Sequence, residues 1–503
     1  MAPRWPDRYN VRVSRLTHLP YKYLVAIVFI FGLFMDLMDT TVVNVAIPTL
    51  SREFHASTSA VEWTVTGYLL SLAVFIPAAG FFSDRFGTKR IFLIAMAIFV
   101  AGSAACGLAQ SIPQLVAFRF VQGIGGGMMT PVGTAMLSRE FPGAERAKAS
   151  AIIAVPVVLA PTLGPVIGGY LTEYVSWRWI FYINLPVGVA GILFGLSVLE
   201  EHKEAYAQNR IDVLGLVTGS AGAAATLYAI SQAGAEGWGS TSVVGFGLAG
   251  VALLAAFTLI ELRVRYPVLD LRLLKRWFFA SSNLMMMPAF GAFGGFILVL
   301  TLFLQELRGY SPLQAGLIQG PSAIGTAISL PLASRIYASV GPRRMLLGGF
   351  ALAALSLLPF LAIDADTPVW IIVVLLVMRG LPFAFAVVAA QTLMFGPIES
   401  EKQGPASSIY STLRQIAASF GVALIITILI DRTKSHGGGA GVTTAAAQHA
   451  AVLGYHDAFF ACFALFLIPL AVAYFIDDRK AAEALSRRTP PPIEAAEVVA
   501  GGG

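Results

Sequence analysis

Two aspartates stand inside an otherwise apolar run near the start of the chain, at positions where a charge is costly. Asp36 and Asp39 are one helical turn apart, and Thr40 and Asn44 continue a polar stripe at four-residue spacing from Asp36. A carboxylate in mid-membrane costs roughly 2.5–3.5 kcal/mol on insertion scales, so it usually has a partner, a water-filled space or a proton to carry. Desolvation and mutual repulsion both favour protonation. We interpret the pair as candidate proton carriers, with Thr40 and Asn44 as candidate cavity residues. The alternative is a structural pair bonded to neighbouring helices.

An arginine stands in a later apolar run, where it needs a partner. Arg119 is followed by Gln122, another candidate cavity residue, and by a glycine run at 123–127. The aspartates of the first run are the obvious partners if the first and fourth runs face each other. The alternative is an arginine that extends to the membrane surface. The glycines favour close helix packing over nucleotide binding, because no strand precedes them and no P-loop lysine follows.

The turn at 80–90 combines glycines, basic residues and one carboxylate. Orientation in a membrane would explain the basic residues, but Asp84 can meet a helix N-terminus or an arginine and hold a cytoplasmic gate shut. A weaker copy of this turn at 338–344 indicates an internal repeat. The candidate gate residues are Gly80, Asp84, Arg85, Gly87, Lys89 and Arg90.

Small residues and prolines recur at 160–169, which predicts a kinked helix that packs closely on its neighbours. The residues concerned are Gly164, Pro165, Gly168 and Gly169, and a purely architectural role is the alternative. Weaker candidates for a binding cavity are Glu306, Arg379 and Arg414, which structural pairing would also explain. The six histidines fall in tails, in loops or at one span end, and both cysteines fall inside apolar runs, so we expect no metal site.

Composition places these residues in a membrane protein. Apolar residues make up 57% of the 503 residues and charged residues 12%, against roughly 45–50% and about 25% in soluble domains. Apolar runs of about 20 residues, the length that crosses a bilayer, recur about fourteen times. A membrane barrel would instead show short segments of alternating polarity. The sequence therefore predicts an all-α polytopic membrane protein.

Basic residues gather in alternate loops. Most of the 34 Lys and Arg residues fall on the side that holds both termini, so we expect both termini in the cytoplasm of a multi-pass cell (plasma or inner) membrane protein. This placement also explains the net charge of +6 without nucleic acid. The expected parts are a cytoplasmic N-terminal tail (1–21), a six-helix bundle (22–200), two inserted transmembrane helices with a cytoplasmic linker (201–276), a second six-helix bundle (277–476) and a disordered cytoplasmic tail (477–503). We also expect a flexible external loop at 433–453.

These motifs together resemble a known family. The run 39–48, the turn 80–90, Arg119 with Gln122, and the glycines of 164–169 are similar, in order, to the signature motifs of the major facilitator superfamily, specifically its fourteen-span drug:proton antiporters. The resemblance covers nearly the whole chain. It implies the major facilitator fold of two six-helix bundles plus two additional transmembrane helices. It also implies a rocker-switch exporter driven by proton influx, in which Asp39 couples to protons and Arg119 is its electrostatic partner.

Two positions depart from the family pattern. Asp36 stands where the family usually has a small or apolar residue, which would change proton stoichiometry or favour cationic substrates. Ala338 and Ser339 replace the acidic and basic residues of the second gate turn. We therefore expect any gate to depend on the first half of the chain.

The expected function is export of small lipophilic or cationic compounds in exchange for protons by alternating access. A dedicated proton-coupled exporter of one metabolite, peptide or lipid would share every motif. A membrane enzyme would need a clustered catalytic set and an ATP-driven pump a P-loop, neither of which the sequence contains. The expected partners are a small-molecule substrate, protons and the lipid bilayer. No cofactor beyond the proton gradient is expected. We expect a functional monomer and leave an accessory efflux protein open.

Overall fold

The computed structural model describes residues 19–141, 160, 163–202, 212–265, 267–398, 402–437 and 445–486, and within these ranges the chain is helical with no strand. The first half contains α1 (Tyr21–Glu53), α2 (Thr58–Phe86), α3 (Thr88–Gly107), α4 (Ile112–Glu140), a helical segment over 163–174, α6 (Trp179–Tyr182) and α7 (Asn184–Val198). Ser57 and Ser111 begin α2 and α4 by accepting hydrogen bonds from backbone amides of the first turn.

An inserted hairpin separates the halves. It consists of α8 (Val213–Glu236) and α9 (Thr241–Arg263), followed by the short η3 (Leu271–Lys275). The second half contains α10 (Trp277–Leu302), η4 (Phe303–Leu307), α11 (Pro312–Gln319), α12 (Ser322–Val340), α13 (Pro342–Leu355), η5 (Leu358–Leu361), α14 (Val369–Phe395), α15 (Gln403–Ser435), α16 (Ala445–Tyr474) and α17 (Asp478–Ser486).

The helices account for the expected crossings. Within the described residues, 11 helices are long and apolar enough to span a membrane. Helix α4, the α11–α12 pair and the helix over 163–174 stand where the sequence predicts the remaining three. The all-α fold of two six-helix bundles plus two additional helices is therefore confirmed. Of the span expected at 148–171, residues 148–159, 161 and 162 lie outside the described residues.

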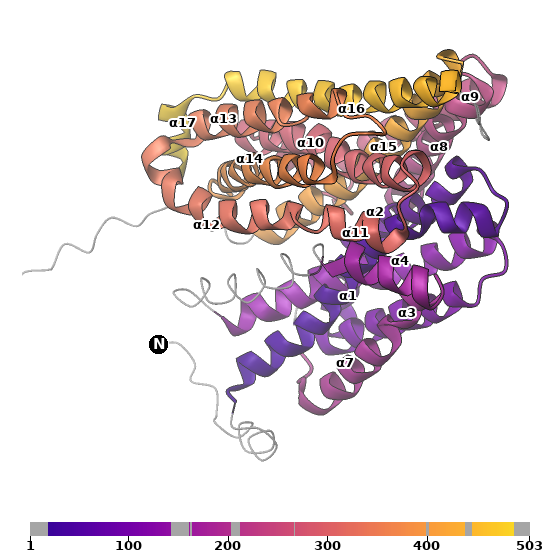
Figure 1. Ribbon diagram of the computed structural model, residues 1–503. Helices are drawn as coiled ribbons and strands as arrows, with labels where there is room; N and C mark the ends of the chain where they lie inside the picture. Colours follow the sequence, from indigo (N-terminus) through magenta and orange to yellow (C-terminus); the bar gives the residue numbers. More distant parts are fainter. Residues whose placement is uncertain are drawn as a thin grey trace, which may run out of the picture.

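The two halves meet at one end of the molecule and diverge toward the other. Figure 1 shows α2 against α15 and α8, while the ribbons separate toward the N-terminus and α17. We call the end that holds the turns at Gly87 and Gly341 the gate end, and the opposite end, which holds Gln305, the far end. At the far end, Gln305 donates a 2.8 Å hydrogen bond to the carbonyl of Val45 in the other half.

Two stretches expected to lack structure are partly helical. Residues 445–453 belong to α16, so the loop expected at 433–453 is shorter than predicted, and its residues 438–444 lie outside the described part of the chain. Residues 478–486 form α17, so the expectation of disorder is wrong for them. The reason is local: Asp478 stands in the first turn of α17 and contacts α13, which gives this short helix a place to dock.

Candidate functional site

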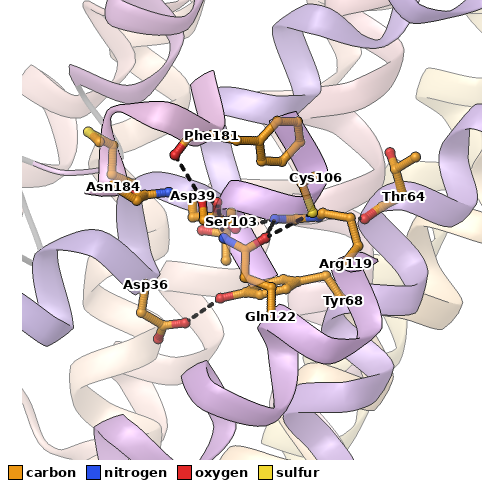
Figure 2. Close-up of polar contacts among 12 residues, drawn as sticks. Asp36, Asp39, Thr64, Tyr68, Ser103, Cys106, Arg119, Gln122, Phe181 and Asn184 are labelled. Carbon is orange, nitrogen blue, oxygen red and sulfur yellow. Dashed lines mark hydrogen bonds and ion pairs between the residues drawn. The ribbon is translucent and has the colours of Figure 1, made fainter. Parts of the chain in front are cut away.

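Asp39 and Arg119 form a buried ion pair in the first half. Arg119 of α4 donates to Asp39 Oδ2, and neither side chain is exposed. Figure 2 shows the guanidinium pointing from α4 toward α1, between the carboxylate and the carbonyl of Thr64, to which Arg119 Nε donates at 2.9 Å. Burial of both charges requires such pairing, because either one alone would be strongly destabilising. Of the two alternatives for Arg119, the structure has the paired one.

Two amides complete the surroundings of Asp39. Gln122 donates to Asp39 Oδ1 at 2.9 Å and accepts from Arg119 at 2.8 Å, so one side chain contacts both members of the pair. Asn184 of α7 donates to Asp39 Oδ1 at 3.3 Å and to Ser103 Oγ at 3.1 Å. The carboxylate therefore accepts from three side chains on two helices, which satisfies both of its oxygens.

A glycine sets the position of Gln122. A Cβ at Gly102 of α3 would lie 2.6 Å from the Cα of Gln122, which is closer than van der Waals contact allows. Glycine at this point lets α3 and α4 approach backbone to backbone. Gln122 is thereby fixed within reach of Asp39.

Asp36 occupies a separate but linked position. Tyr68 donates to Asp36 Oδ1 at 2.7 Å and Thr130 donates to Oδ2 at 3.1 Å. The ring of Tyr68 also lies under the guanidinium of Arg119, with Cζ 4.0 Å from the ring centre, as Figure 2 shows. One aromatic side chain thus connects the two aspartates that the sequence singled out.

The other polar residues of α1 turn back to their own helix. Thr40 Oγ1 donates to the carbonyl of Leu37 at 2.7 Å, and Asn44 Nδ2 donates to the carbonyl of Thr40 at 3.3 Å. These bonds are local and join neither residue to the Asp39 pair. These hydrogen bonds therefore do not join the polar stripe of α1 into one network, and a cavity role for Thr40 and Asn44 stays a prediction.

The gate turn binds a carboxylate that the sequence did not indicate. Gly87 has φ of +101°, a conformation that favours glycine, and allows α2 to end and α3 to begin at once. Glu201, which follows α7, accepts from the backbone amides of Lys89 and Arg90 at 3.2 Å each. Lys89 Nζ donates to carbonyls at the end of α7, including that of Leu196 at 3.1 Å.

The remaining gate residues make fewer contacts. Arg85 is exposed and lies over the ring of Phe86, and nothing lies within 4 Å of a Cβ placed on Gly80. The side chain of Asp84 lies outside the described part of the structure. The expected contact of Asp84 with a helix N-terminus or an arginine therefore stays a prediction.

The second turn repeats the first. Gly341 has φ of +84° between α12 and α13, and the backbone amide of Arg343 donates to Asp478 Oδ1 at 2.8 Å. In each half, a carboxylate that follows the last transmembrane helix thus binds the N-terminus of the third helix of that half. The faint repeat in the sequence is a repeat of structure.

The glycines of 164–169 bring backbones together at the far end. A Cβ on Gly164 would lie 2.0 Å from Thr41 Oγ1, and one on Gly168 would lie 2.8 Å from the carbonyl oxygen of Val42, so this segment packs directly on α1. A Cβ on Gly169 would lie 2.5 Å from the carbonyl oxygen of Pro312. A Cβ on Gly316 of α11 would in turn meet the carbonyl oxygen of Pro165 at 2.1 Å. The segment therefore joins the two halves where they meet.

The three weaker candidates lie in the second half. Glu306 is exposed in η4 at the far end, near enough to Arg52 to interact electrostatically. Arg379 of α14 is buried over the ring of Phe296 at 3.8 Å. Arg414 of α15 lies 5.8 Å from the ring centre of Phe290. None of the three belongs to the Asp39 network.

Sequence reasoning missed several polar residues. Tyr68, Ser103 and Asn184 carry no charge and therefore do not stand out in an apolar run. Glu62 of α2 did carry a signal, a carboxylate inside an expected span, and it was overlooked. Its side chain is 1% exposed, one oxygen accepts from Thr66 at 3.2 Å, and the other has no hydrogen-bond partner among the described residues.

A pocket among four helices has an apolar lining. The pocket lies among α2, α8, α9 and α15 and is lined mainly by aliphatic side chains with Phe257 and Thr412. In the ranges that the structure describes, no group of three or more His, Cys, Asp or Glu residues could hold a metal ion.

Comparison with known proteins agrees with this architecture. The family model of the Major Facilitator Superfamily matches residues 29–422. The multidrug resistance protein B homolog of Mycobacterium tuberculosis (strain CDC 1551 / Oshkosh) is 35% identical over 437 residues, covering 84% of this chain and 78% of the relative. The tetracenomycin C resistance and export protein of Streptomyces glaucescens is 32% identical over 420 residues, covering 83% of this chain and 78% of the relative.

Solved structures share the fold at low sequence identity. A bacterial homolog of the human lysosomal transporter Spinster, in its inward-facing and occupied conformation, has a TM-score of 0.65 at 16% identity and covers 94% of this chain and 100% of its own. A D-xylose-proton symporter has a TM-score of 0.63 at 15% identity, with 92% and 99% covered. With a family match over most of the sequence, two helical bundles and a shared transporter fold, this chain belongs to the Major Facilitator Superfamily of membrane transporters.

Proposed function

We propose that this transporter exports small lipophilic or cationic compounds across the cell membrane in exchange for protons. The observation that carries the proposal is the buried pair of Asp39 and Arg119, in which a carboxylate and a guanidinium are held together without exposure. Such a pair is a two-state element, because protonation of the carboxylate removes the charge that holds the arginine. A proton at Asp39 would therefore loosen α1 from α4.

Alternating access follows from how the halves meet. Within the described residues, the hydrogen bonds between the halves lie at the far end, where Gln305 bonds the carbonyl of Val45 and Glu173 accepts from the amide of Leu313 at 3.1 Å. With both termini in the cytoplasm, as the basic loops predict, the gate end faces the cytoplasm. The conformation described here is then closed to the outside. Proton binding at Asp39 from the outside would accompany return to this state after substrate release.

The proposed roles of the remaining residues follow from their contacts. Gln122 and Asn184 hold Asp39 in place through bonds to one carboxylate oxygen. Asp36, linked through Tyr68, is a second acceptor for protons or for a cationic substrate. The gate turn stabilises the first half at its cytoplasmic end through Glu201. The relatives named for multidrug resistance support a broad substrate range, whereas the relative named for tetracenomycin C supports a dedicated exporter.

The test is transport of a lipophilic cationic dye by proteoliposomes with and without a pH gradient. We expect the native protein to move dye only with the gradient, Asp39→Asn to abolish this dependence and Asp36→Asn to alter it. Asp457→Asn is the matched control, because Asp457 is partly exposed and pairs with His436 and Arg432 away from the network. A native protein that ignores the gradient would refute proton coupling. Competition among unrelated compounds separates a broad exporter from a dedicated one.

A further inference from the structure

In the described part of the chain, two guanidinium groups of the second half have N–H groups without a hydrogen-bond acceptor. Arg379 of α14 is 7% exposed, and within the described residues it makes no hydrogen bond or ion pair. Arg414 of α15 is half-buried, and its Nε atom is buried with no hydrogen-bond partner in the same part of the chain. Buried charged donors are normally paired, because leaving them unpaired is costly. These two positions therefore have unused capacity to bind an acceptor.

Aromatic rings connect the two arginines. We define the aromatic strip as Phe290, Phe293, Phe296 and Phe383. Arg379 lies over two of its rings, with Cζ 3.8 Å and 5.1 Å from their centres. Arg414 lies 5.8 Å from a third ring, at the other end of the strip.

Three rings of the strip are in contact with one another, and Arg379 joins Phe296 to them. Phe293 and Phe383 are stacked with centroids 5.3 Å apart and an interplanar angle of 13°. Phe383 meets Phe290 edge to face at 5.9 Å. Phe290, Phe293 and Phe383 are only partly buried, so their faces are not wholly used by the core. Ring faces attract a cation, but they provide no acceptor for its N–H groups.

The equivalent arginine of the first half is satisfied differently. Arg119 and Arg379 both lie on the fourth transmembrane helix of their half and both contact that half's first helix. In the first half the contact is the carboxylate of Asp39, and in the second half it is the ring of Phe296. The second half thus has the cation without the internal anion.

The two aspartates of α1 already accept hydrogen bonds. Asp36 accepts from Tyr68 and Thr130, one donor for each oxygen. Asp36 is also close enough to Arg414 for the two charges to interact electrostatically, which places this end of the strip on the side of the second half that faces α1. Among the described residues, Arg379 and Nε of Arg414 are the charged donors here without a hydrogen-bond acceptor. A ligand that satisfies them must offer an acceptor, and a carboxylate offers an acceptor together with the opposite charge.

We propose that the second half binds aromatic compounds that carry a carboxylate, with the acid held by Arg379 or Arg414 and the ring held by the aromatic strip. The planar fork of a guanidinium matches the two oxygens of a carboxylate, and an aromatic ring fits partly exposed phenylalanine faces. This substrate class rests on the proposed function and extends it from cationic compounds to aromatic acids.

The direct test compares two probes with the same ring and opposite charge. Binding of 2-naphthoate and of 2-naphthylmethylammonium to the native protein in nanodiscs is measured by equilibrium dialysis. We expect the native protein to bind the carboxylate at least tenfold more tightly. Equal binding, or tighter binding of the ammonium probe, would overturn the proposal without any variant.

Variants locate the site. Arg379→Gln with Arg414→Gln should reduce naphthoate affinity at least tenfold and remove the preference over the ammonium probe. The control is Arg263→Gln, because Arg263 is exposed at the end of α9 and should leave both affinities unchanged. Naphthoate binding that survives in the double variant would place the acid elsewhere and overturn the assignment.

Two further arms separate an aromatic acid from other anions. Replacing gluconate in the buffer by chloride should leave naphthoate affinity unchanged. Replacing zwitterionic lipid in the nanodisc by anionic lipid should do the same. Displacement by chloride or by anionic lipid would assign the arginines to an inorganic ion or to a lipid headgroup instead. Dialysis requires no pH gradient, whereas dye transport does, so failure of this proposal and failure of proton-coupled export give different results.

Discussion

The guanidinium of Arg119 lies over the ring of Tyr68, whose hydroxyl donates to Asp36. Because Arg119 also holds Asp39, this one tyrosine contacts Asp36 directly and is linked to Asp39 through Arg119. A change of protonation at Asp39 that moves Arg119 must therefore alter the support of Tyr68, and with it the hydrogen bond to Asp36. The two aspartates are coupled through a ring.

Replacement of Tyr68 separates its two contacts. Tyr68→Phe keeps the ring under Arg119 and loses the donor to Asp36, whereas Tyr68→Leu loses both. A desolvated cation–π contact is worth about 2 kcal/mol, so we expect the leucine variant to be less stable than the phenylalanine variant by about that amount. Thermal unfolding of the purified variants, followed by tryptophan fluorescence, measures the difference. Equal stability would mean that the ring contributes nothing to the binding of Arg119.

A double-mutant cycle measures the buried pair. Asp39→Asn and Arg119→Gln should each destabilise the protein by about 3–5 kcal/mol, because each leaves an uncompensated buried charge. The double variant should lower the free energy of unfolding by less than the sum of the two single variants. Arg432→Gln with Asp457→Asn is the control cycle, since that pair is largely exposed at 3.8 Å and should show a coupling below about 1 kcal/mol. Additive effects in both cycles would contradict the pairing.

Substitution at Gly316 should force the far end open. An alanine Cβ there would meet the carbonyl oxygen of Pro165 at 2.1 Å, so α11 and the segment 163–174 would have to separate. Spin labels at Arg52 and Ala365, exposed positions of the two halves, should report longer distances in Gly316→Ala. Gly348→Ala is the matched control, because nothing lies within 4 Å of its Cβ. Unchanged distances in the Gly316 variant would show that the far end relaxes without opening.

Loss of the carboxylate at either turn should loosen that turn alone. Glu201→Gln removes the charged acceptor at the start of α3, and Asp478→Asn removes the one at the start of α13. Each capping interaction is worth about 1 kcal/mol, so hydrogen exchange at the corresponding amides should accelerate about fivefold. The two effects should be independent because the turns belong to different halves. A variant in one half that accelerates exchange in the other would refute this.

Charged residues of the site could be found from the sequence because a charge inside an apolar run is conspicuous. Asp39 and Arg119 were paired on this ground, although they are 80 residues apart. Tyr68 and Asn184 could not be found in the same way, since polar uncharged residues are common in helices and their role depends on which helix faces which. Glu201 contacts Lys89 across 112 residues of chain, a pairing that only the folded arrangement specifies.

The fold was more predictable than the site because helix length in a membrane is set by the bilayer. Span number followed from the apolar runs, and only local details differed, such as the break between α11 and α12 near Gly320 and Pro321. Where helices begin and end outside the apolar runs is harder to predict from the sequence. Residues 445–453 and 478–486 are helical despite small or charged side chains, because they continue or dock against a packed helix.

The two carboxylate-bound turns also have a mechanical consequence. Glu201 fastens the chain after α7 to the start of α3, and Asp478 fastens the chain after α16 to the start of α13. In each half, the chain after the last transmembrane helix is thus bound to the start of the third helix. We expect each half to move as one body, so that motion between the halves is taken up where α2 packs on α15 and where Gln305 bonds Val45.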